Sequence, residues 1–256
     1  MESALESYRR ALHLASKGSS TERRLHMRIG TVLTWQGKYQ DALEEFNQVT
    51  GIGAFDGTGR VRFLMGELKA AENEFLRAIN GSATYGNAHN GLGRVHLEQG
   101  KLQEAEANFK EAEKCLNASA KNMRLLHRSS LGLWWENYLP WDPHPYWIIK
   151  NLGMAQLLLG RTQDALNAFW NAEQLAKKRL SEVGEDFAAK YTLVIALLGR
   201  DEAKLAIEAL EEAMKLCTAK GVVEDFLKDI RLLKKVAFLR NHAESMETII
   251  DSVQHD

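Results

Sequence analysis

Apolar residues recur every three to four positions along most of the chain, a periodicity typical of amphipathic helices. Residues 29–49 read IGTVLTWQGKYQDALEEFNQV, with an apolar stretch, then a glycine, then a second stretch in which alanine and phenylalanine stand four apart. Positions four apart lie on one face of a helix, and a glycine readily ends one. The segment therefore predicts two short helices joined by a tight turn.

The same pattern returns in residues 58–78, 92–112 and 152–172. Each copy holds two glycines seven apart, namely Gly30/Gly37, Gly59/Gly66, Gly93/Gly100 and Gly153/Gly160. Each second helix carries an alanine and a phenylalanine, namely Ala42/Phe46, Ala71/Phe75, Ala105/Phe109 and Ala165/Phe169. The first glycine lets the two helices approach closely, and the alanine and phenylalanine form the buried face. One such hairpin cannot bury that face alone, so the hairpins are expected to stack.

These glycine, alanine and phenylalanine spacings resemble the tetratricopeptide repeat family, whose period is 34 residues. Ala71 and Ala105 stand 34 apart, and a weaker fifth unit has Thr192 at its first glycine position. The step of 41 from Ala165 to Ala206 resembles the longer-repeat type of the family in the C-terminal half. The resemblance implies an all-α fold, a right-handed α-solenoid of about five helix pairs with C-terminal capping helices.

The departures from the period suggest how a single solenoid spanning residues 1–256 is organised. We expect an N-terminal helix in 1–20, repeats 1–3 in 21–116, an insertion in 117–147, repeats 4–5 in 148–220 and capping helices in 221–256. The glycine-rich stretch 51–59 should shorten the helix before it and weaken the one after it. In the caps, buried faces are expected at Val222, Phe226, Ile230 and Leu233, and at Ala243, Met246, Ile250 and Val253.

The insertion concentrates aromatic residues and holds all three prolines of the chain, Pro140, Pro143 and Pro145. Its aromatic set comprises Trp134, Trp135, Tyr138, Trp141 and Tyr146. One interpretation is structural: the rings pack an extra helix and crossover against the stack. The other is a rigid aromatic surface for a partner, because aromatic side chains often carry much of the binding energy at interfaces.

Composition and motifs argue against several function classes. With 33 Lys+Arg against 34 Asp+Glu, the net charge of −1 gives no global reason to expect nucleic acid as a partner. No apolar run is long enough for a membrane span, no secretion signal is present, and a cytoplasmic location is the default. Cys115 and Cys217 are expected to be buried thiols. His89 and His96 lack further metal ligands, and no catalytic motif occurs, so we expect neither cofactor nor metal and no enzyme activity.

By the family resemblance, the first helix of each pair lines a concave groove that binds extended segments of partners. The expected groove residues are Arg24, Arg28, Thr31, Arg60, Asn87, Asn90, Arg94, Trp147, Lys150 and Asn151. Trp35, Asp56 and Phe63 share these faces. The five cations could form a basic ladder, which favours an acidic partner. In the alternative, the arginines pair with the chain's own carboxylates, such as Asp56 or Glu98.

Some members of the family hold chaperone tails through a two-carboxylate clamp. The corresponding positions here are Met27, Thr31, Gly57, Asn87 and Gly91, which depart from the clamp's lysine, arginine and asparagine pattern. The leading hypothesis is therefore a non-enzymatic scaffold that binds a peptide or protein segment in the groove. The first alternative is the ligand-sensing segment of a larger regulator, such as a signal-transduction ATPase or a transcription regulator. An enzyme built on helical hairpins would need a pocket of titratable groups that the sequence does not assemble.

Overall fold

The computed structural model describes residues 2–127 and 145–255, with side chains for 2–118 and 145–253. All regular elements of this described part are helical, which confirms the all-α prediction. After a single helix come five helix pairs and then the C-terminal helices. In chain order they are α1 (Glu2–Leu14), α2 (Ser20–Trp35), α3 (Tyr39–Asn47), α4 (Ile52–Leu64), α5 (Leu68–Gly81), α6 (Gly86–Glu98), α7 (Leu102–His127), α8 (Pro145–Leu158), α9 (Thr162–Val183), α10 (Phe187–Gly199), α11 (Ala203–Leu216), α12 (Lys220–Leu233), a 3-10 turn (Ala237–Leu239) and α13 (Arg240–His255).

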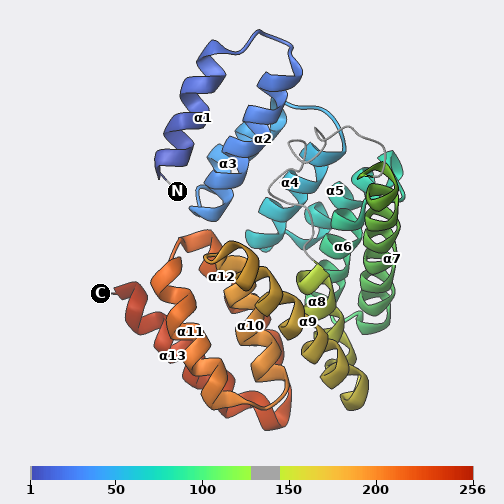
Figure 1. Ribbon diagram of the computed structural model, residues 1–256, viewed down its shortest axis with the longest axis vertical. Helices are drawn as coiled ribbons and strands as arrows, with labels where there is room; N and C mark the ends of the chain where they lie inside the picture. The colour runs from blue at the N-terminus through green and yellow to red at the C-terminus, as the bar shows by residue number, and fades with distance from the viewer. Residues whose placement is uncertain (1, 128–144, 256) are drawn as a thin grey trace.

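Consecutive helices pack on one another along an arc, as expected of a solenoid (Figure 1). The arc runs from the blue α1–α3 through α4–α7 to α8–α11. It curls far enough that the last elements return to the first, and α12 contacts α2. The even-numbered helices α2, α4, α6, α8 and α10 line the inner side of this curl.

The glycines and phenylalanines of the repeat meet as the sequence predicts. The Phe46 ring lies between two glycines, one from its own pair and one from the next, and a Cβ added at Gly30 or Gly57 would lie 2.7 Å from it. Phe75 is held in the same way, with an added Cβ 2.8 Å away at Gly59 and 2.3 Å away at Gly91. No carbon atom fits at these distances, so glycine lets each ring stack between two helices.

The second glycine of each pair forms the turn between the helices. Gly37, Gly66, Gly100 and Gly160 have φ values of 74°, 80°, 75° and 76°, in the left-handed region that glycine adopts without steric cost. The fifth pair lacks this glycine, and Asp201 takes the left-handed conformation there, with φ 63°. The helix after the glycine-rich stretch forms over 13 residues, whereas α3 before it has only 9.

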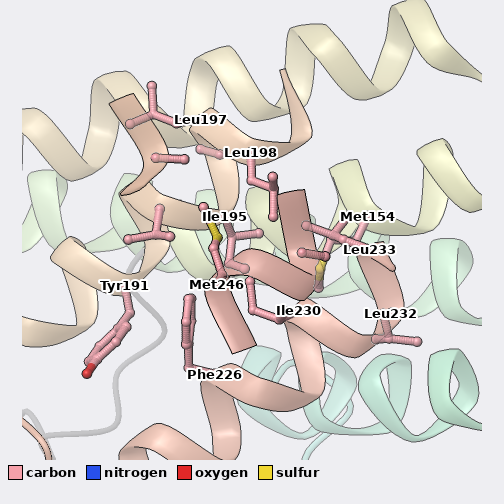
Figure 2. Close-up of a cluster of buried hydrophobic side chains, with 14 of the residues drawn as sticks. Met154, Tyr191, Ile195, Leu197, Leu198, Phe226, Ile230, Leu232, Leu233 and Met246 are labelled. Atoms are coloured by element: carbon pink, nitrogen blue, oxygen red, sulfur yellow. The ribbon is translucent and has the colours of Figure 1, made fainter. Parts of the chain in front are cut away.

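Helix α12 differs most from the expectation of a cap. It contacts α2, α4, α8 and α10, the inner helices, so it lies on the concave side of the array. Its apolar face joins the large core shown in Figure 2, where Phe226 and Ile230 lie among side chains of α10 and of α13. The Phe226 and Tyr191 ring centroids are 4.8 Å apart. All four apolar positions expected on its buried face are buried.

Helix α13 packs on α11 and α12 and so covers the last pair, as a cap should. Ala243, Met246 and Ile250 are fully buried, but Val253 is 44% exposed and does not belong to the buried face. Cys115 and Cys217 are buried thiols, as expected. Among the described residues, no helix is long and apolar enough to cross a membrane.

Of the expected aromatic surface, only Tyr146 lies within the described residues. It is 1% exposed in α8, where it packs edge-on against Trp147 with ring centroids 6.0 Å apart, and burial raises its pKa. Tyr146 is therefore part of the core, which agrees with the structural interpretation at this position. Trp134, Trp135, Tyr138 and Trp141 lie outside the described residues.

Candidate functional site

The concave side of the array encloses a cavity of about 380 Å³. Its walls come from α2, α4, α6, α8 and α10, from the turn before α10, and from α12. Every helix pair contributes, because the inner helices all face the centre of the curl. A cavity of this size is typical of sites that hold small ligands or a few side chains of a partner.

Seven of the ten predicted groove residues line this cavity: Arg60, Asn87, Asn90, Arg94, Trp147, Lys150 and Asn151. The other three lie elsewhere. Arg24 is exposed near the start of α2, the Arg28 guanidinium lies over the Tyr8 ring of α1, and the Thr31 hydroxyl donates to the Met27 carbonyl at 2.7 Å. These three residues do not line the cavity, because the lining residues of α2 are Thr34 and Trp35 in its last turn.

Two cations of the expected basic ladder already have carboxylate partners on α12. Arg94 donates to Asp225 at 2.6 Å and to Asp229 at 3.3 Å, and Lys150 also donates to Asp229. Burial alone would raise the pKa of Asp225, but the charges of Arg94, Arg60 and Lys150 outweigh it and hold the pKa below its usual value. The interpretation that arginines pair within the chain thus holds for Arg94, with partners on α12 and not Asp56 or Glu98.

Aromatic faces hold the cations in place. The Arg60 guanidinium lies 5.8 Å from the Trp147 ring centroid, and that of Arg94 lies 4.7 Å from the centroid of Phe63. Lys228 of α12 also contacts the Phe63 ring, with its ammonium nitrogen 5.0 Å from the ring centroid. Such cation–π contacts fix long side chains that would otherwise be mobile. The cations of the polar wall are therefore held by contacts within the chain itself.

Two buried acceptor oxygens of the cavity wall have no hydrogen-bond partner among the described residues. They are Oδ1 of Asp56 on α4 and Oδ1 of Asn151 on α8, in side chains whose residues are 3% and 2% exposed. Asn151 uses its Nδ2 to donate to Asn90 Oδ1 at 2.9 Å. Burial raises the pKa of Asp56 to about 6, against the lowering effects of Arg60 and of the hydrogen bond from Tyr85. Buried acceptors without donors are uncommon and costly.

The two ends of the array meet beside the cavity. Trp35 of α2 and Phe187 of α10 pack edge to face, with ring centroids 5.4 Å apart. A Cβ added at Gly221 would lie 1.9 Å from the Thr34 carbonyl oxygen, so the α12 backbone touches the end of α2. Tyr39 donates a hydrogen bond to Glu224 of α12. These contacts close the curl through α12.

Sequence reasoning missed the contribution of α12 because its apolar face indicated a cap. The missed lining residues include Asp225, Asp229 and Phe226 from α12, Arg179 near the end of α9, and Glu185, Asp186, Phe187 and Tyr191 around the start of α10. One signal was available: Asp225 and Asp229 stand four apart, so α12 has an acidic face beside its apolar one. The lining contains no His, Cys or Ser, and no cluster of metal-binding side chains occurs among the described residues.

A tetratricopeptide repeat family model matches residues 57–120. Among solved structures, a thermophilic TPR protein of Thermus thermophilus is 16% identical, with a TM-score of 0.52 over 82% of this chain and 98% of that one. PilF of Pseudomonas aeruginosa is 18% identical, with a TM-score of 0.48 over 90% and 91% of the two chains. A tetratricopeptide repeat protein of Parabacteroides merdae is 14% identical, with a TM-score of 0.47 over 98% and 85%.

No curated protein sequence matches the chain. The family match and the helix-pair packing agree with the glycine and phenylalanine contacts described above. They support a protein-interaction scaffold as the general functional class. Residues 57–120 belong to the tetratricopeptide repeat family, and the helix pairs on either side of them continue the same array.

Proposed function

We propose that the chain is a non-enzymatic interaction scaffold that binds a short polar segment of a partner protein in its concave cavity. The observation that carries this proposal is the convergence of the inner helices on one cavity with unsatisfied buried acceptors. Neutral or cationic groups that donate hydrogen bonds would compensate these acceptors. Catalytic activity is not part of the proposal.

The cavity limits what can bind. At about 380 Å³ it accepts a few side chains of a partner, not a whole extended segment laid along an open groove. The expected acidic partner loses much of its support, since Arg94 and Lys150 are neutralised by Asp225 and Asp229. The bound segment should therefore enter with one or two polar residues and keep the rest outside.

A second candidate function is the sensing of a small ligand within a larger regulator. The cavity volume lies in the range of small-molecule sites, and closure by α12 links the first and last helix pairs around it. A ligand there would bridge elements from both ends of the array. The two candidates share one site and differ in whether the ligand is attached to a protein.

The test is a peptide-display selection against the purified chain, compared with a variant whose cavity is filled. Ala188 lines the cavity near the start of α10, so Ala188→Trp should fill part of it without removing a polar group. Ala107 is exposed on α7, away from the cavity, and Ala107→Trp is the matched control. Selected peptides should bind the wild type and the control but not Ala188→Trp. Equal binding to all three proteins would refute the cavity as the binding site.

A further inference from the structure

The ionisable side chains of the cavity wall do not balance. Four are basic: Arg60, Arg94, Lys150 and Arg179. Five are acidic: Asp56, Glu185, Asp186, Asp225 and Asp229. The wall thus carries one net negative charge when all of its carboxylates are ionised.

The internal ion pairs show where the excess lies. Arg94 and Lys150 are engaged with Asp225 and Asp229, and Arg179 donates to Asp186 at 3.0 Å. The two remaining carboxylates of the wall are Asp56, which is buried, and Glu185, which is exposed. Arg60, on the same helix as Asp56, lowers the pKa of that carboxyl, but burial outweighs this effect. Asp56 is therefore the carboxylate of the wall whose desolvation is least compensated.

We propose that the cavity takes a primary ammonium group, seated on the Asp56 carboxylate, with Asn151 accepting a further N–H of the same ligand. This inference rests on the proposed function, because it assigns the chemistry of the ligand to the same cavity. An ammonium has three donors and no acceptor, which matches two buried oxygens that lack donors. A charge-assisted hydrogen bond is among the stronger polar contacts.

The rest of the wall suits the same ligand. The indole of Trp147 and the rings of Trp35 and Phe187 line the cavity and offer apolar contact to an alkyl chain that carries the ammonium. Aromatic faces also attract cations. An anion at Arg94 or Lys150 would have to displace Asp225 or Asp229. The ion pairs with α12 therefore disfavour an anion at these two cations.

The test titrates n-butylammonium, the neutral analogue n-butanol and N-acetyl-lysine methylamide into the full chain. Binding is followed by the NMR signals of the indole N–H groups of Trp35 and Trp147, which line the cavity. Both ammonium compounds should bind and n-butanol should not. Asp56→Asn keeps the shape of the side chain and should weaken ammonium binding about tenfold or more, the scale of one charged hydrogen bond. Asp251→Asn, at an exposed position of α13, should leave the affinity unchanged.

The outcomes separate the source of the ammonium. Tighter binding of N-acetyl-lysine methylamide than of n-butylammonium supports a lysine side chain of a partner, and the reverse supports a free small amine. Binding of neither compound, or equal affinity of Asp56→Asn and wild type, overturns the ammonium site. If Ala188→Trp still abolishes peptide binding in that case, the scaffold function stands and only the ligand chemistry is wrong.

Discussion

The Asp56→Asn variant should be more stable than the wild type at neutral pH, although it removes a charged side chain from a polar wall. Asp56 is 3% exposed, and its burial raises the pKa to about 6 from an ordinary value of 3.8. Only Arg60 on the same helix and the Tyr85 hydroxyl counter this rise. The ionised form of Asp56 therefore has a less favourable free energy in the folded chain than in the unfolded chain.

The magnitude follows from proton linkage. The rise of the Asp56 pKa from 3.8 to about 6 corresponds to about 3 kcal/mol of folding free energy. Between about pH 4 and pH 6 the folded state binds more protons at Asp56 than the unfolded state does, so its contribution to the free energy of unfolding falls as the pH rises. Well above about pH 6, Asp56 is ionised in both states, and its contribution to the free energy of unfolding falls no further. Asn cannot ionise, so the variant should gain up to about 3 kcal/mol at pH 7.5 and little near pH 4.

The assay is urea unfolding followed by circular dichroism at pH 4, 5, 6 and 7.5 for the wild type, Asp56→Asn and the exposed control Asp251→Asn. The control should stay within about 0.5 kcal/mol of the wild type. An unchanged dependence of the unfolding free energy on urea would show that the same unit unfolds. A variant that is less stable than the wild type at pH 7.5, or a gain that does not shrink toward pH 4, would refute the reasoning. A stability gain accompanied by lost ammonium binding would show that the wild-type carboxylate costs stability at a functional position.

Three further substitutions test the packing. Gly221→Ala should destabilise the chain by about 1–3 kcal/mol, because the added Cβ would overlap the end of α2. Helix propensity alone predicts that the same change stabilises the chain. Thermal unfolding of this variant, beside the exposed control Arg231→Ala, shows whether the stability falls or rises. Asp229→Ala should cost about 3–5 kcal/mol in chemical unfolding, because it leaves Lys150 buried without its carboxylate, and a cost near zero would contradict the ion-pair account. Phe75→Ala should cost about 3–5 kcal/mol in the same assay, and a cost below about 1 kcal/mol would show that the ring does not stack as described.

The sequence predicts those parts of the fold whose contacting residues lie close along the chain. Gly59 and Phe75 belong to one hairpin, so the spacing of small and aromatic positions reports their contact directly. The turn at Gly66 is equally local, because its left-handed backbone conformation depends on the glycine itself. The array of helix pairs could therefore be derived from periodicity and steric reasoning.

The site could be predicted only in part, because its partners are distant in sequence. The sequence placed Arg94 on the inner face, but its partner Asp225 is 131 residues away. Asp225 belongs to α12, whose apolar face indicated a capping helix. Curvature of the array decides which ends meet, and no local pattern encodes that curvature. Asp56 illustrates the same limit, because its burial and the cations near it depend on how the other helices pack around α4.

The central claim is that α12 of the same chain occupies the concave side and closes the cavity. It is tested most directly by joining α12 to the turn after α2, where a Cβ at Gly37 would lie 3.1 Å from the Lys220 Cβ. That spacing is close to the Cβ separation in disulfides, about 3.5–4.5 Å, so small shifts would allow a bond. Any side chain at Gly37 is strained by the backbone φ of 74°, so the control protein must carry the same substitution.

The measurement is the oxidation of Gly37→Cys/Lys220→Cys in a background without Cys115 and Cys217, followed by intact mass and free-thiol titration. The pair Gly37→Cys/Ala107→Cys, with one thiol on α7, is the control. The account predicts an intramolecular disulfide in the first protein, with loss of two hydrogens and no titratable thiol, and two free thiols in the control. Two free thiols in a folded Gly37→Cys/Lys220→Cys protein would contradict it.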